Sequence, residues 1–143
     1  MKKILIINGP NLNLLGNREN DIYGNLTLKE IEDSCLKLAS THNIPLECYQ
    51  SNSESDIINQ IQKVKENKVT DIIVNLAAYS HTSIAILDAL KAVNCNIFEV
   101  HISNIFARED FRHKSYVSSI AKIVISGAKH FGYLMLIDYI ANN

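Results

Sequence analysis

The chain has 143 residues, of which 47% are hydrophobic and 20% are charged, and its formal net charge is −1. This length suits one domain, residues 1–143, which can bury roughly two thirds of the surface of the unfolded chain. The small net charge provides no general attraction to nucleic acid or to a membrane surface, and no apolar run is long enough to span a bilayer. We therefore expect a globular protein with no nucleic-acid or membrane partner.

Cysteine and histidine usage argues against a disulfide framework and against a metal site. The three cysteines, Cys35, Cys48 and Cys95, are widely spaced without a C-x-x-C pair, and the five histidines include no H-x-x-x-H pair. Reduced thiols in the cytoplasm explain this pattern. The apolar run Ile4–Ile7 follows two lysines, as in a signal peptide, but it ends after four residues, which is too short for one.

Apolar β-rich runs alternate with helical patterns from one end of the chain to the other. Helices are expected to begin at the capping box Thr27–Glu30, at Ser53 with Asp56, and at about Thr82, where Thr82 or Ser83 is the cap; a last helix runs from about Lys129 to Ile140. The expected strands are Ile4–Ile7, Leu46–Tyr49, Asp71–Leu76, Ile97–His101 and Ile123–Ser126.

Nearly apolar strands separated by helices predict a parallel sheet that is covered on both faces. Right-handed crossovers then favour an α/β fold, a flavodoxin-like doubly wound five-stranded parallel sheet of order 2-1-3-4-5. Ligands of such sheets bind beyond the carboxyl ends of the strands, near the switch between the first and third strands. The polar residues that follow three strands converge on this edge: Asn8, Asn11, Asn75, His81, His101 and Ser103.

The connection between the first strand and the first helix is unusually long. It runs from Gly9 to Asn25, and its part at about 16–25 is a candidate lid, although a solvated surface loop explains the length about as well. The chain has eleven lysines and three arginines, Arg18, Arg108 and Arg112, all in loops near the predicted site. Arginine is favoured where a permanent charge or a planar donor is needed, although chance also explains so small a number.

Glu99 and His101 lie two residues apart on one strand, so their side chains share a face. A carboxylate beside a histidine fixes the tautomer and favours the protonated ring, which suits a general acid. Taken alone, this pattern is more often a structural pair. His81, in the segment after the third strand, and Asp88, on the following helix, are equally explained by structural or solvated roles.

Taken together, these segments resemble the type II 3-dehydroquinate dehydratases over essentially the whole chain. The landmarks keep one order along the sequence: Asn8–Gly16, Arg18, Tyr23-Gly24, Ser51–Glu54, Asn75–Ser83, Glu99–Asn104, Ala107–Glu109 and Phe111–His113. Ala77 and Lys129 stand where that family often has glycine, Ser80 where it usually has threonine, and Asn20 where a lid proline is common. Ala77 matters only if its backbone needs a positive φ.

The resemblance implies anti elimination of water from 3-dehydroquinate through an enolate, with no cofactor and no metal. It implies Tyr23 as the base with Arg18 as its neighbouring cation, Asn11 as the residue that positions a water on the enolate, and His101 as the general acid oriented by Glu99. It also implies a homo-oligomer, a dodecamer built from trimers. The substrate-binding residues that it implies are Asn75, His81, Asp88, Ile102, Ser103 and Arg112.

Two other classes of protein were compared with this interpretation. A flavodoxin-like small-ligand-binding or signalling domain would need a Ser/Thr- and Gly-rich phosphate loop or a phosphorylatable aspartate, and the chain has Asn8 and Asn75 at those places. A thiol hydrolase that uses Cys95 and His101 would need the two side chains in contact, but a strand between them separates them by roughly 20 Å.

Overall fold

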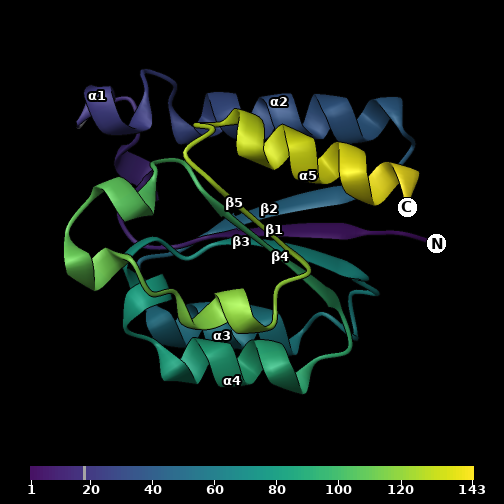
Figure 1. The fold of residues 1–143 in the computed structure, drawn as a ribbon. Coiled ribbons are helices and arrows are strands. Elements are labelled where there is room, and N and C mark those ends of the chain that lie inside the picture. The colour runs from purple at the N-terminus through teal and green to yellow at the C-terminus, as the bar shows by residue number, and fades with distance from the viewer. Residues whose placement is uncertain (18) are drawn as a thin grey trace.

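The computed structural model describes residues 1–17 and 19–143, and its centre is one parallel sheet (Figure 1). The strand order is β2-β1-β3-β4-β5, and every neighbouring pair is parallel. This confirms the predicted α/β fold and strand order. The strands are β1 (Ile4–Asn8), β2 (Leu46–Gln50), β3 (Asp71–Asn75), β4 (Asn96–His101) and β5 (Ile123–Ser126).

Two layers of helices cover the sheet. Helices α2 and α5 pack together on one face, and α3 and α4 pack together on the other (Figure 1). Each layer encloses its own apolar core, and Ile4 and Ile6 of β1 face one core while Leu5 and Ile7 face the other. This alternation explains why β1 is apolar at every position. The helices are α1 (Asn20–Tyr23), α2 (Leu28–Thr41), α3 (Glu54–Gln62), α4 (Ile84–Ala92) and α5 (Phe131–Asn142).

The predicted caps set three of the helix starts. Thr27 and Glu30 form the reciprocal capping box of α2, and the Ser53 hydroxyl accepts from the Asp56 N–H at 3.2 Å. Of the two candidates before α4, Ser83 is the cap, since its hydroxyl accepts from the Ile86 N–H at 3.0 Å. Each bond satisfies a backbone donor that the helix itself leaves unpaired.

Helix α5 begins two residues later than predicted, because Lys129 has a φ of +54° and cannot be helical. Ala77 also has a positive φ, +52°. Both positions where the resembled family often has glycine therefore need the left-handed conformation, in which a Cβ costs roughly 1–2 kcal/mol. The long connection after β1 is also more ordered than a simple loop, since it contains a 3-10 turn at Leu12–Leu14 and helix α1.

Gly132 lets α5 lie close against the sheet. A Cβ at this position would lie 2.6 Å from Cγ2 of Val100 and 3.3 Å from Cγ2 of Ile125. The next residue, Tyr133, is consequently brought down between the helix and the sheet, where it is fully buried.

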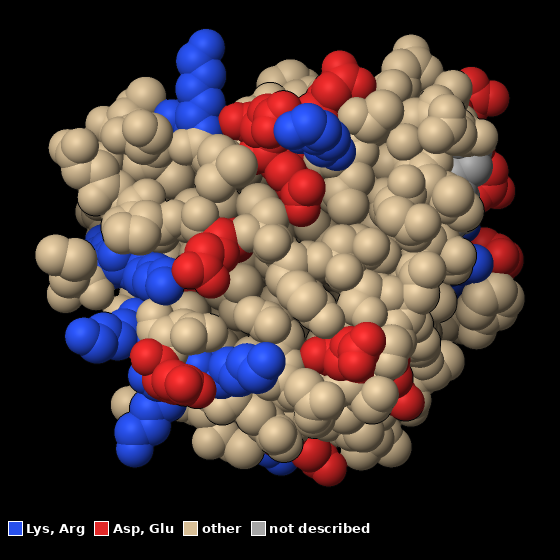
Figure 2. All heavy atoms as spheres, turned by 180° about the vertical axis from the view of Figure 1, so that it is seen from behind, with Lys and Arg blue, Asp and Glu red and all other residues tan. Residues whose placement is uncertain are grey.

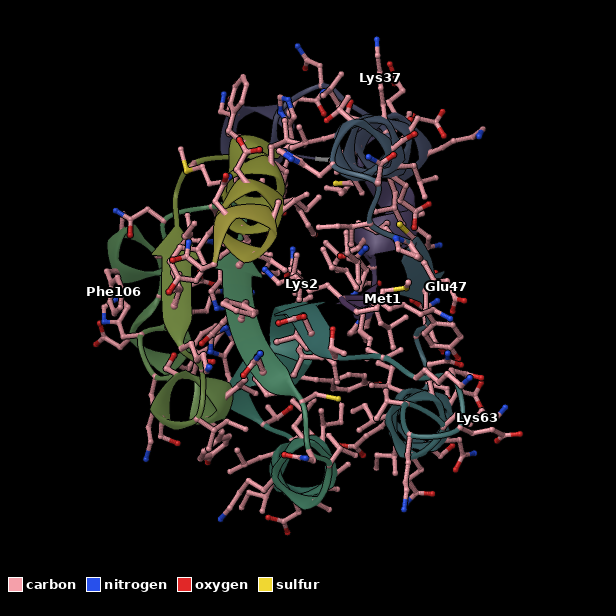
Figure 3. The ribbon with its side chains drawn as sticks, turned by 90° about the vertical axis from the view of Figure 1, so that its right-hand side faces the viewer. Met1, Lys2, Lys37, Glu47, Lys63 and Phe106 are labelled. Carbon is pink, nitrogen blue, oxygen red and sulfur yellow. The ribbon has the colours of Figure 1, made fainter. Side chains whose placement is uncertain are left out.

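Figure 3 turns the molecule by 90°, so that the side with Met1 and Lys2 faces the viewer between the two helical layers. Lys37 on α2 and Lys63 after α3 lie on opposite faces of the sheet in this view. No helix among the described residues is both long enough and apolar enough to cross a membrane.

Candidate active site

A narrow cavity of about 100 Å³ opens at the carboxyl ends of β1, β3 and β4. The segments that follow these three strands meet there, as the topology predicted. Of the predicted site residues, eight line this cavity: Asn11, Tyr23, Asn75, His81, His101, Ile102, Ser103 and Arg112.

His101 and Glu99 form a buried hydrogen-bonded pair at the end of β4, in which Nε2 of His101 contacts the Glu99 carboxylate. Two serines also donate to this carboxylate, Ser115 Oγ at 2.5 Å and Ser118 Oγ at 2.6 Å. Burial on its own raises the pKa of Glu99, but the hydrogen bond and charge of His101 and the two serine donors together hold it below its usual range. Glu99 is therefore a carboxylate at neutral pH, and Nδ1 is the ring nitrogen of His101 that this pair leaves for a ligand.

Tyr23 lies at the end of α1 and is held by Arg108. The guanidinium donates from Nη1 to the Tyr23 hydroxyl at 2.7 Å, and it also lies over the ring, 5.3 Å from its centroid. The same nitrogen lies 3.3 Å from the Ser103 hydroxyl. Arg108 therefore links Tyr23 to Ser103 through one guanidinium nitrogen.

Arg108 is a site residue that the sequence interpretation missed. The resemblance gave the role of the cation beside Tyr23 to Arg18, which lies outside the described residues. The signal for Arg108 was present, because it is one of only three arginines in a chain with eleven lysines. Sequence alone did not show which arginine approaches the tyrosine, since 85 residues separate Tyr23 from Arg108.

His81 lies beside His101 with the two rings stacked and their centroids 6.2 Å apart. Its Nδ1 donates to the Lys114 carbonyl oxygen at 2.8 Å. Burial lowers the pKa of His81, against the opposing effect of this hydrogen bond, and the neighbouring positive groups lower it further. The ring is therefore neutral near pH 7 and presents Nε2 as a hydrogen-bond acceptor.

Asn75 is held in place by neighbours at the end of β3. Its Nδ2 donates to the Tyr133 hydroxyl at 2.9 Å, and its Oδ1 accepts from the Ala77 N–H at 3.3 Å. Asn11 has a φ of +68° and anchors its backbone N–H on the Asn52 side chain at 3.0 Å. Arg112 donates from Nε to Glu109 at 3.1 Å, which leaves its two terminal nitrogens for an anion.

Asp88 does not belong to this cavity in the single chain. It is exposed on α4 and is absent from the lining of the cavity. The cavity of one chain therefore does not include Asp88, and its role as a substrate ligand stays a prediction. The physical reason is that α4 runs back from the carboxyl edge toward the opposite edge of the sheet, carrying Asp88 away with it (Figure 1).

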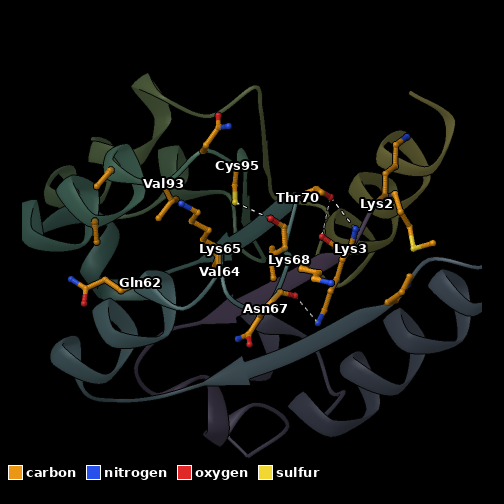
Figure 4. Close-up of a pocket in the computed structure, with 16 residues that line it drawn as sticks. Lys2, Lys3, Gln62, Val64, Lys65, Asn67, Lys68, Thr70, Val93 and Cys95 are labelled. Atoms are coloured by element: carbon orange, nitrogen blue, oxygen red, sulfur yellow. Dashed lines mark hydrogen bonds between the residues drawn. The ribbon is translucent and has the colours of Figure 1, made fainter.

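A second cavity, of about 1060 Å³, lies at the opposite edge of the sheet (Figure 4). Lys and Arg side chains gather on this side of the molecule (Figure 2). Cys95 lines this cavity and donates to the Val69 carbonyl at 3.3 Å, at the opposite end of β4 from His101, which rules out a Cys95–His101 nucleophile–base pair. Burial, together with the Asp71 carboxylate, raises the pKa of the Cys95 thiol.

Fold and site together define an α/β enzyme whose buried groups are arranged for proton transfer. The comparison with known proteins identifies the family to which it belongs. Residues 2–141 match the model of the family described as dehydroquinase class II, and the chain belongs to that family.

Relatives and solved structures agree with this assignment over the full length. A 3-dehydroquinate dehydratase of Legionella pneumophila is 51% identical, covering 98% of this chain and 97% of its own. One of Clostridium botulinum is 48% identical, covering 100% of this chain and 97% of its own. The type II dehydroquinase structure from Butyrivibrio crossotus superposes with a TM-score of 0.95 at 45% identity, covering 99% of this chain and 98% of its own. The type II dehydroquinase structure from Propionibacterium acnes superposes with a TM-score of 0.94 at 37% identity, covering 100% of this chain and 98% of its own.

Proposed function

We propose that the protein dehydrates 3-dehydroquinate to 3-dehydroshikimate by anti elimination through an enolate, as a hydro-lyase of the shikimate pathway of aromatic amino-acid biosynthesis. The observation that carries this proposal is that two proton-handling groups open on one cavity. They are Tyr23 with its arginine and His101 with its carboxylate. Elimination of water needs one base and one acid, and these pairs supply them.

In the first step Tyr23, as the phenolate, removes a proton beside the ketone, and the electron pair of that C–H bond moves to the ketone oxygen as an enolate. Arg108 stabilises the phenolate that the step requires, and Arg18 remains the predicted second cation. Asn11 would hold a water against the enolate oxygen.

In the second step the enolate collapses, the bond from carbon to the departing hydroxyl breaks, and Nδ1 of His101 delivers the proton that makes it water. Glu99 holds the imidazolium through Nε2 and keeps the ring oriented. Tyr23 ends protonated and His101 neutral, so one proton must return from tyrosine to histidine through solvent before the next turnover.

Substrate would be held by polar groups around the cavity. The Asn75 amide and Nε2 of His81 would bind hydroxyl groups, the Ile102–Ser103 segment would bind the carboxylate with its backbone and hydroxyl, and Arg112 would add charge. The cavity is smaller than most small-molecule sites, and two of its lining residues, Tyr23 and Arg108, contact each other. The lid at about 16–25 stays a prediction, and Arg18 within it lies outside the described residues.

We further propose that the chain works as a single domain in the cytoplasm and as a homo-oligomer, a dodecamer built from trimers. One feature supports assembly: α5 exposes a stripe of large apolar side chains at four-residue spacing, Phe131, Met135 and Tyr139. In such an assembly Asp88 would bind substrate only if it reached the cavity of a neighbouring copy. Sedimentation would test the assembly.

The activity test uses the purified chain with 3-dehydroquinate and follows the ultraviolet absorbance of a conjugated enone. We expect absorbance to grow with wild type, equally after exhaustive treatment with a chelator, and not with His101→Ala. A folded wild-type sample that produces no absorbance would rule out the proposed function and would favour a flavodoxin-like binding domain.

A further inference from the structure

Tyr133 connects α5 to the carboxyl ends of two strands through a buried chain of hydrogen bonds. Its hydroxyl donates to Asn8 Oδ1 at 2.6 Å and accepts from Asn75 Nδ2 at 2.9 Å. All three residues are buried, and only Asn75 lines the candidate active site. A tyrosine hydroxyl placed so deeply is costly unless both its donor and its acceptor functions are used, as they are here.

One backbone group fixes which atom donates and which accepts in each of these hydrogen bonds. The Ala77 N–H can only donate, and it donates to Asn75 Oδ1 at 3.3 Å. The amide nitrogen of Asn75 must then face Tyr133, so the Tyr133 oxygen accepts and its single proton goes to Asn8. Burial raises the pKa of Tyr133 well above its usual value, which keeps this proton on the hydroxyl.

This arrangement of hydrogen bonds determines which group Asn75 presents to the active site. With Oδ1 held by Ala77 and one N–H held by Tyr133, Asn75 has one amide N–H left to offer to the cavity. Without the Tyr133 hydroxyl, only the 3.3 Å bond from the Ala77 N–H would hold the amide against turning and presenting its oxygen instead. We propose that Tyr133 is a positioning residue that locks Asn75 as a hydrogen-bond donor, so that the site selects an acceptor oxygen on the substrate at this point.

Packing alone gives no reason for the hydroxyl. Phenylalanine would fill the same space, and the other inward residues of α5, Leu136, Ile137 and Ile140, are aliphatic. The network also leaves Asn8 Nδ2 buried without a hydrogen-bond partner among the described residues. A buried donor left unpaired is a cost, so the arrangement is not the one that maximises stability.

This inference rests on the proposed function, because it is tested through turnover of 3-dehydroquinate. The variant is Tyr133→Phe, and the matched control is Tyr49→Phe on β2, a partly buried tyrosine whose hydroxyl makes no hydrogen bond to a described residue. We expect Tyr133→Phe to raise KM by about three- to tenfold while kcat and the pH profile change little, since one hydrogen bond to substrate becomes misdirected. The control should match wild type in both constants.

Two further measurements separate positioning from general destabilisation. On an Asn75→Ala background, Tyr133→Phe should cause no further rise in KM, whereas an independent structural effect would add. In the wild-type protein, the side-chain NH₂ signals of Asn75 should show one proton protected from exchange and the other shifted when 3-dehydroshikimate is added.

The NMR measurement needs no variant, so the inference stays testable even if Tyr133→Phe folds poorly. Additive effects in the double variant, or an Asn75 NH₂ group that does not respond to 3-dehydroshikimate, would overturn it. An inactive wild type would instead remove the proposed function on which it rests.

Discussion

The two edges of the sheet carry very different cavities. The carboxyl edge has the narrow one, about 100 Å³, with a buried carboxylate, two histidines and a tyrosine held by arginine. The amino edge has a cavity of about 1060 Å³, lined by apolar side chains and by Lys2, Lys3, Lys65 and Lys68, with no Asp or Glu among its described lining residues. The smaller cavity nevertheless holds the groups that can move protons.

The difference shows that converging strand ends and buried polar groups, rather than the volume of a cavity, indicate where the candidate active site lies. At the carboxyl edge each polar group is fixed by another, and the low dielectric strengthens every such interaction. At the amino edge, Lys65 and Lys68 follow the end of α3, and Lys2 Nζ donates to the Ile140 carbonyl in the last turn of α5, so their charge lies near the negative ends of two helix dipoles. Lys3 is already paired with Glu47 at 2.9 Å, and it donates to the Asn67 carbonyl at 3.0 Å, as Figure 4 shows.

The largest expected effect separates the two edges directly. Tyr23→Phe and His101→Ala should each lower kcat by about a thousandfold or more, since each removes one proton-transfer group. The double variant Lys65→Ala/Lys68→Ala at the amino edge should keep the wild-type kcat. Steady-state assays with 3-dehydroquinate check both, and full activity of Tyr23→Phe would eliminate Tyr23 as the base.

A smaller effect is expected at Arg108, where charge and shape can be separated. Arg108→Lys keeps the charge but loses the planar fork, and Arg108→Gln loses the charge, so activity should fall in the order arginine, lysine, glutamine. Raising the pH should partly restore Arg108→Gln by ionising Tyr23 directly. A kcat loss with no such restoration would mean that Arg108 positions Tyr23 or the substrate rather than stabilising the phenolate.

Glu99→Gln should have an intermediate effect, about ten- to a hundredfold in kcat, because it weakens the orientation of His101 without removing the acid. It should also change the response of stability to pH. The pKa of Glu99 is held below its usual value of 4.5 in the folded protein, so its stabilising contribution is present at neutral pH and is lost progressively as the pH falls below 4.5. Urea unfolding at pH 7 and pH 4 measures this: the variant should lose less stability than wild type between the two.

The sequence predicted the fold, and it predicted that the polar residues after three strands meet at one edge of the sheet, because those features are local or topological. Alternation of apolar strands with capped helices determines the sheet order, and the sheet order brings Asn75, His81 and His101 to one edge. Contacts that depend on side-chain packing were not predictable. Examples are the approach of Arg108 to Tyr23 and of Ser115 to Glu99, and the burial of Tyr133 above Asn75, since hydrophobic periodicity specifies which face of a helix is inside but not which atoms meet there.

The smallest expected effect concerns backbone strain, which both edges contain. Ala77 at the carboxyl edge has a φ of +52°, and Lys68 at the amino edge has a φ of +60°. A Cβ in this conformation costs roughly 1–2 kcal/mol, and glycine removes that cost. Glycine also lowers the free energy of unfolding by about 0.5–1 kcal/mol, because it has more conformational entropy in the unfolded chain. Ala77→Gly and Lys68→Gly should therefore each raise the free energy of unfolding by about 0.5–1 kcal/mol in urea titrations.

Their kinetics should nevertheless differ, because the Ala77 N–H holds Asn75 Oδ1 whereas Lys68 contacts nothing at the active site. A more flexible backbone at residue 77 should loosen that hydrogen bond and raise KM by about twofold, while Lys68→Gly should leave KM unchanged. Equal KM values in the two glycine variants, with both stabilised, would mean that strain at the carboxyl edge has no part in holding Asn75.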